Sequence, residues 1–235
     1  MADSRLLMGA MGGAGQITDQ AVARDNPARS HGRVDGYSVG AYATWFINQG
    51  VNGSGFYLDG WAQYGEYNNK TIGDLLPTQQ YDSHNWVGSL EAGYAFALLQ
   101  QKGNPWYIEP EAQLFYSDYR QAALTEVNGT QIRSDGVGGW ISRLGVRFYG
   151  RNPRNNGDIV QPFVELNWWH SQNQAAVMMN DTRVDDDMPR NRYELKVGLL
   201  AQLGKRWSLW ADLGVQAGGD NYSGVQGQLG AKFSW

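Results

Sequence analysis

The 235-residue chain combines a polar mean hydropathy of -0.51 with 13% aromatic and only 18% charged residues, and it contains no cysteine. The polar mean, with no apolar run of about 18 residues, excludes a helical membrane protein, and the lack of cysteine excludes a disulfide scaffold and a thiol nucleophile. The formal net charge of -4 at pH 7 gives no electrostatic basis for binding nucleic acid.

Apolar and polar residues alternate with a period of two along the whole chain, which predicts β-strands. The final segment shows this best, because Leu229 and Phe233 fall on one face and Gln228 on the other. Each segment has about ten residues, the length at which a tilted strand crosses a bilayer. Ten segments are predicted, and they begin near Arg5, Val34, Phe56, Trp86, Trp106, Gly139, Val160, Arg192, Trp207 and Ser223.

The connections between these segments are predicted to alternate in length. Long connections are expected at 16–33, 68–85, 121–138 and 171–191, with a shorter one on the same side at 217–222. Short connections are expected at 48–55, 99–105, 151–159 and 204–206. This alternation is typical of an outer-membrane barrel, whose periplasmic turns are short and whose extracellular loops are long. We therefore predict an all-β fold, a transmembrane antiparallel β-barrel with about ten strands in this chain.

A soluble all-β barrel is the alternative, and its polar face would be rich in Lys, Glu, Arg and Thr. Here the polar face carries mainly Gly, Ser, Gln and Tyr, with scattered Glu and few lysines. Aromatic residues stand near the ends of many predicted strands: Tyr37, Trp45, Trp86, Trp106, Tyr116, Trp168, Trp207 and Trp235. Because amphipathic rings are enriched at both membrane–water interfaces, these positions favour the membrane barrel.

The C-terminal residues 228–235 resemble the signal that the barrel-assembly machinery reads at the end of an outer-membrane barrel. The residues that carry this resemblance are Gln228, Gly230, Phe233 and Trp235. We therefore expect the barrel-assembly machinery to be a partner of this chain.

Six segments make the chain similar to the translocator domain of AIDA-type autotransporters of Gram-negative bacteria. They are 34–45 (VDGYSVGAYATW), 57–64 (YLDGWAQY), 89–94 (SLEAGY), 106–113 (WYIEPEAQ), 143–146 (RLGV) and 161–168 (QPFVELNW). They occur in the family's order and at its spacing, and together they cover nearly the whole chain.

The resemblance implies a translocator of type V secretion that exports an N-terminal passenger and anchors it at the cell surface. Family barrels have twelve strands preceded by an α-helical linker, and segment 34–45 resembles the fourth strand. Residues 1–235 are therefore expected to be one barrel domain, resembling strands 3–12, from a longer precursor that also holds the passenger, the linker and two more strands. The expected partners are outer-membrane lipid, lipopolysaccharide and the passenger, and we expect no cofactor, no metal and no enzyme.

Alternation also predicts which polar side chains line the pore. The acidic set dominates and suits a hydrated channel, although such groups can equally serve to solvate the interior and pair across strands. The predicted pore-lining residues are Asp59, Gln63, Glu91, Glu109, Glu111, Gln113, Arg143, Arg147, Glu165, Glu194, Lys196, Asp212 and Lys232.

Two further readings concern chemistry. Some family members cut their passenger inside the barrel with help from a lumen carboxylate, which makes Glu109, Glu111 and Glu165 candidates for a general base. The alternatives to a translocator are an adhesin that binds through its long loops and an omptin-like protease at the outer rim. The protease would use histidines and nearby aspartates near the long connections: His31, His84, His170, Asp35, Asp82 and Asp181.

Overall fold

The computed structural model describes residues 4–22, 28–47, 53–74, 76–101, 104–126, 129–154, 157–186, 188–204, 206–219 and 221–234. Ten strands of the described chain form one antiparallel sheet in chain order, which confirms the predicted all-β fold and its ten strands. They are β1 (Arg5–Val22), β2 (Arg29–Ile47), β3 (Gly55–Gly73), β4 (Leu76–Gln101), β5 (Asn104–Gln121), β8 (Gly139–Gly150), β10 (Ile159–Ser171), β13 (Asn191–Leu203), β14 (Trp207–Gly218) and β15 (Ser223–Phe233). The described residues contain no helix long and apolar enough to cross a membrane.

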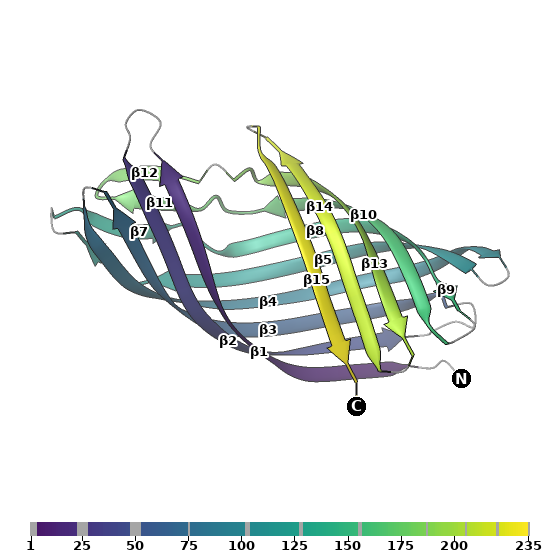
Figure 1. Ribbon diagram of the computed structural model, residues 1–235. Helices are drawn as coiled ribbons and strands as arrows, with labels where there is room; N and C mark the ends of the chain where they lie inside the picture. The colour runs from purple at the N-terminus through teal and green to yellow at the C-terminus, as the bar shows by residue number, and fades with distance from the viewer. Residues whose placement is uncertain are drawn as a thin grey trace.

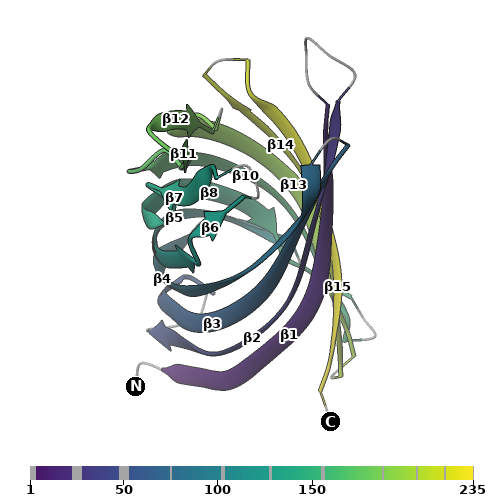
Figure 2. The ribbon, with the colours of Figure 1, turned by 90° about the vertical axis from the view of Figure 1, so that its left-hand side faces the viewer.

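The sheet curls into an open half-barrel with a concave inner face (Figures 1 and 2). Each strand of the main sheet pairs with its neighbours in that order, and the short β9 (Asn152–Pro153) pairs with β10 at one end. Both chain ends lie at the end of the half-barrel that carries the short connections. Within the described residues β1 and β15 do not pair, so each of these outer strands leaves one edge of backbone donors and acceptors without a strand partner.

The prediction of long loops at 16–33 and 68–85 was wrong, because the strands continue through most of both segments. The pairing of β1 with β2 runs on to Val22↔Arg29, and that of β3 with β4 runs to Gly73↔Leu76. The backbone ladder needs only amide partners, so it persists where the side chains are polar on both faces and the apolar alternation has stopped. Near the start of the extension on β2, Arg33 Nε donates a hydrogen bond to Asp35 at 2.6 Å, which lowers the pKa of the Asp35 carboxyl group.

The other two long connections contain a small second sheet. Its strands are β6 (Leu124–Thr125), β7 (Gln131–Asp135), β11 (Ala176–Met179) and β12 (Thr182–Asp185), in the order β12-β11-β7-β6. It brings the β5–β8 connection against the β10–β13 connection, and Figure 1 shows β7, β11 and β12 at the end of the half-barrel away from the chain termini. Arg183 pairs there with Asp135 and, at 2.7 Å, with Asp185. The sequence predicted these segments only as loops.

Large apolar side chains cover the convex face, as an inside-out barrel requires. Leu90, Leu166 and Leu213 are 57%, 60% and 63% exposed. Outward aromatic rings form two belts. The belt toward the long connections contains Tyr37, Tyr64, Trp86, Tyr116, Trp140, Trp168 and Tyr193, and the belt toward the short connections contains Trp45, Phe96, Trp106, Phe148, Trp207 and Phe233.

The separation of the two belts fits a bilayer. On β4, Trp86 and Phe96 are ten residues apart, about 33 Å along an extended strand. At the usual barrel tilt of about 40° this becomes about 25 Å across the membrane, the height of the apolar band in outer-membrane barrels. The aromatic residues named from the sequence therefore lie where rings at headgroup depth are expected, except Trp235, which lies outside the described residues.

Candidate lumenal site

The concave face gathers most of the polar residues expected to line a pore. Nine of the thirteen surround one cavity of about 500 Å³. These nine are Asp59, Glu91, Glu109, Glu111, Gln113, Arg143, Arg147, Glu165 and Lys196. The set contains five carboxylates and three cationic side chains, so the cavity has an acidic excess.

The other four residues lie on the same face but outside this cavity. Glu194 is 3% exposed and accepts hydrogen bonds from Asn167 at 2.8 Å and Gln226 at 2.5 Å, which link it to the cavity wall. The register places Gln63 opposite Gly40 and Val87, Asp212 opposite Gly198 and Gln228, and Lys232 opposite Ser208. Alternation keeps these three on the concave face, nearer the ends or edges of the sheet.

Arg143 on β8 is the centre of the polar network, and its side chain is only 8% exposed. Its Nη2 lies 2.9 Å from a carboxylate oxygen of Glu91 and 2.9 Å from one of Glu111, while Nη1 lies 2.8 Å from Glu165. One guanidinium therefore joins carboxylates from β4, β5 and β10. Such multiple charge-assisted hydrogen bonds are needed to offset the cost of burying the charges.

Two neighbouring residues complete the coordination of Arg143. Nε donates to Gln113 at 2.8 Å and Nη1 to Asn167 Oδ1 at 2.9 Å, so the guanidinium is fully surrounded by acceptors. Gly145, next along the inner face of β8, leaves room for this arrangement. A Cβ at that position would lie 2.4 Å from Asn167 Oδ1, a separation that real Cβ atoms do not show.

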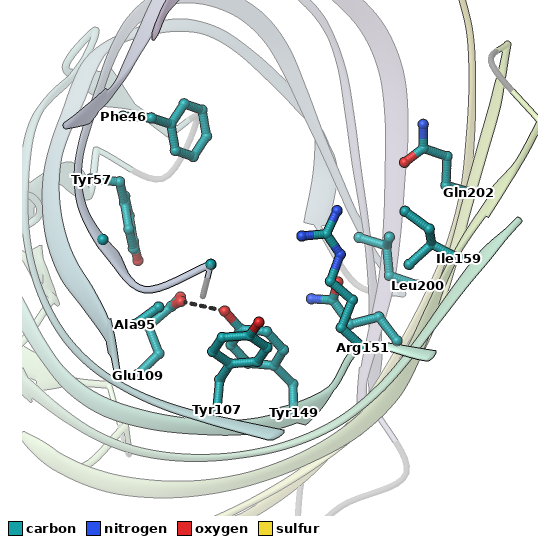
Figure 3. A pocket seen from close by; sticks show the side chains of 13 residues that line it. Phe46, Tyr57, Ala95, Tyr107, Glu109, Tyr149, Arg151, Ile159, Leu200 and Gln202 are labelled. Carbon is teal, nitrogen blue, oxygen red and sulfur yellow. Dashed lines mark hydrogen bonds between the residues drawn. The ribbon is translucent and has the colours of Figure 1, made fainter. Parts of the chain in front are cut away.

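A second, smaller cavity of about 200 Å³ lies toward the short connections. Figure 3 shows Phe46, Tyr57, Tyr107 and Tyr149 around it, with Arg151 on the opposite side. Tyr107 and Tyr149 stack at a centroid distance of 5.0 Å, and Tyr149 donates to Glu109 at 3.2 Å. Tyr57 donates to Glu91 at 2.5 Å, which ties this aromatic group to the Arg143 network.

Sequence reasoning missed three aromatic residues on the concave face. Trp61, Phe115 and Trp169 lie beside the polar cavity, and Trp169 lines it. The signal was present, because Trp61 falls between two residues assigned inward, Asp59 and Gln63, and period-two alternation gives it the same face. From the sequence, a role is predicted only for the aromatic residues expected at the membrane interface.

The residues considered for catalysis include three carboxylates on the concave face and three histidines. Glu111 and Glu165 are both bound to Arg143, whereas Glu109 lies outside those ion pairs and accepts from Tyr149. The three histidines occupy separate strands: His31 on β2, His84 on β4 and His170 on β10. Within the part of the chain that the structure describes, no group of three or more His, Asp or Glu side chains is placed to hold a metal ion.

The residues expected to form the assembly signal lie on the last strand. Gln228 and Gly230 are on the concave face of β15, and Phe233 is outward, with its ring 4.9 Å from that of Trp207. Trp235 lies outside the described residues.

The sequence was compared with known protein families and proteins. Residues 2–214 match the family model described as the autotransporter beta-domain. The uncharacterized protein YdeU of Escherichia coli K12 is 37% identical over 216 residues, which are 88% of this chain and 46% of that protein. The autotransporter adhesin AIDA-I of Escherichia coli is 26% identical, over 97% of this chain and 18% of that protein.

The fold agrees with a solved structure. The crystal structure of the transport unit of the autotransporter AIDA-I superposes with a TM-score of 0.89 at 25% identity, covering 98% of this chain and 76% of that one. The chain spans less than half the length of these curated relatives, so it corresponds to one part of them.

Proposed function

The chain belongs to the autotransporter beta-domain family, and from this we propose that it exports an N-terminal passenger through its lumen and anchors it at the cell surface. As a member, it is a translocator barrel of type V secretion located in the outer membrane. The observation that carries the proposal is the pairing of a charged, cavity-forming concave face with an apolar convex face between two aromatic belts. That polarity is what an aqueous path through a bilayer requires.

The proposed pore is a closed barrel, whereas the ten strands form a half-barrel. We propose that two strands upstream of β1 fill the gap between β1 and β15 in the full protein. A linker that precedes these strands in the chain would occupy the lumen. The unpaired edges of β1 and β15 support this, because bare backbone groups cannot face lipid. The polar pore-lining set is then the wall that faces the linker and the passing passenger.

The partners proposed for the full protein follow from its place in the membrane. The convex face contacts lipid, and the rim above the outer aromatic belt meets lipopolysaccharide. Gln228, Gly230 and Phe233 of β15, with Trp235, are proposed as the element that the barrel-assembly machinery recognises.

The translocator domain is not itself catalytic, but passenger release inside the barrel is a separate question. Of the three carboxylates that are candidates for a general base, we propose Glu109 for such a step because Arg143 already holds Glu111 and Glu165. If the full-length protein is cleaved, Glu109→Gln should leave the passenger exported but attached, seen as one large species on a denaturing gel. Cleavage as in the parent protein would remove Glu109 from this role.

Single-channel recording tests the proposed pore. The domain carrying the two upstream strands should form a channel that prefers cations, because the cavity has an acidic excess. Its conductance should fall when the linker is also present. Identical conductance with and without the linker would contradict a lumen-filling linker, and a preference for chloride would contradict the acidic lumen.

A further inference from the structure

Trp61, Phe115 and Trp169 form a continuous row of rings on the concave face, which we call the inner aromatic ladder. The Trp61 and Phe115 centroids are 6.3 Å apart with their planes at 66°, and the Phe115 and Trp169 centroids are 5.7 Å apart at 27°. The rings come from β3, β5 and β10, so the ladder crosses five neighbouring strands of the sheet.

The neighbours of the ladder allow the rings to meet. Ser89 on β4 pairs with both Trp61 and Phe115, and its small side chain lets the two rings come together over the intervening strand. At the other end the Arg143 guanidinium lies 5.8 Å from the Trp169 ring, and Trp169 Nε1 donates to Glu194 at 3.2 Å. The ladder is thus fixed at one end by the central polar network.

Apolar rings in this place need an explanation. All three side chains are only partly buried, and Trp169 borders the polar cavity, so uncovered ring surface faces the lumen. Leaving such surface in water is unfavourable, and the aromatic residues with an interfacial role are on the opposite, convex face. The inner rings therefore provide apolar contact area beside the polar cavity, in addition to the rings around the smaller cavity.

We propose that the inner aromatic ladder is the surface on which apolar and aromatic side chains of an extended polypeptide rest as it passes through the lumen. This rests on the proposed export function. The ladder runs across the strands, so a chain that passes through the lumen meets its rings as a band on one side of the wall. Contact with ring faces is non-directional, which suits a chain of varied sequence, and the adjoining acidic cavity accepts the basic side chains between apolar ones.

The first experiment locates the contact in the full-length protein during export. A photo-crosslinking phenylalanine analogue replaces Trp61, Phe115 or Trp169 singly, which retains a ring at each site. Matched controls are Gln63, a polar neighbour on the same face of β3, and Trp86, an outward ring. Adducts with the passenger are expected at the ladder positions at least threefold above Gln63, and none at Trp86. Equal yields at Gln63 and the ladder would overturn the proposal.

The second experiment measures the contribution of the ladder to passage. Two passengers are compared by pulse-chase, one carrying an apolar-rich segment and one with those apolar residues replaced by Ser. In the parent barrel we expect the passage half-times to differ at least threefold. In the triple variant Trp61→Ser, Phe115→Ser, Trp169→Ser the half-times should become equal.

The outcomes separate this inference from the function on which it rests. An unchanged ratio of half-times in a folded triple variant would overturn the ladder while leaving export intact, whereas no passenger at the surface of the parent protein would overturn export itself. Folding is checked by heat-modifiable gel migration. If the Ser variant does not fold, the triple Gln variant, which keeps longer side chains but removes the apolar ring faces, is expected to reduce the ratio, and an unchanged ratio there would equally overturn the proposal.

Discussion

At the scale of single residues, Arg143 is the centre of the lumenal polar network, because it forms more ion pairs than any other described side chain. It forms ion pairs of 2.8–2.9 Å with glutamates from three strands, although its side chain is almost inaccessible to water. Alternation identified Arg143, Glu91, Glu111 and Glu165 as facing inward. It could not pair them, because the period of a strand fixes the face of a residue but not its height relative to residues on other strands.

Removing this arginine should destabilise the barrel strongly. Arg143→Met leaves three carboxylates without their shared partner, and breaking a buried ion pair from one side costs about 3–5 kcal/mol. We expect a loss of that size in the free energy of unfolding, measured by denaturant titration of the domain in lipid vesicles. Lys232→Met, an exposed inward position near the end of β15, should change it by less than about 0.5 kcal/mol. Equal effects at the two positions would count against the central role of Arg143.

At the scale of elements, the two faces of each strand have opposite solvents. On β13, Val197 is outward and 46% exposed, and its neighbour Lys196 lines the polar cavity. The same adjacency recurs along most long strands of the described sheet and explains why a polar mean hydropathy accompanies a membrane fold. It also gives a matched pair of positions for testing which face meets lipid.

Val197→Arg should lower the free energy of unfolding in vesicles by about 2–4 kcal/mol, because it puts a charge on the lipid face near the bilayer midplane. Lys196→Arg, one residue earlier, keeps a cation in the lumen and should stay within about 0.5 kcal/mol. Denaturant titration followed by tryptophan fluorescence measures both. If Val197→Arg were as neutral as Lys196→Arg, the convex face would be in contact with water, as in a soluble barrel.

The elements also show how far sequence reasoning extends. All ten long strands were predicted, since each has an apolar face that must meet lipid. The extensions after Gln16 and Asn68 were read as loops, because above the membrane neither face needs to be apolar and only backbone pairing remains. The small sheet was missed for a related reason: β6 and β12 are too short for a period to be recognised, and their partners are distant in sequence.

At the scale of the whole molecule, the ten strands form a wall rather than a closed pore. The edges of β1 and β15, the acidic concave face and the belts on the convex face all fit a barrel completed by further strands and filled by a further segment. The family and the superposition with the AIDA-I transport unit agree with this architecture.

Surface accessibility of the passenger tests this account most directly. An epitope placed in the N-terminal passenger of the full-length protein is exposed to protease added outside intact cells, with a periplasmic protein as the control for membrane integrity. We expect the epitope to be digested while the periplasmic control is protected. An epitope that stays protected until the outer membrane is permeabilised, in cells whose barrel shows heat-modifiable migration, would contradict it.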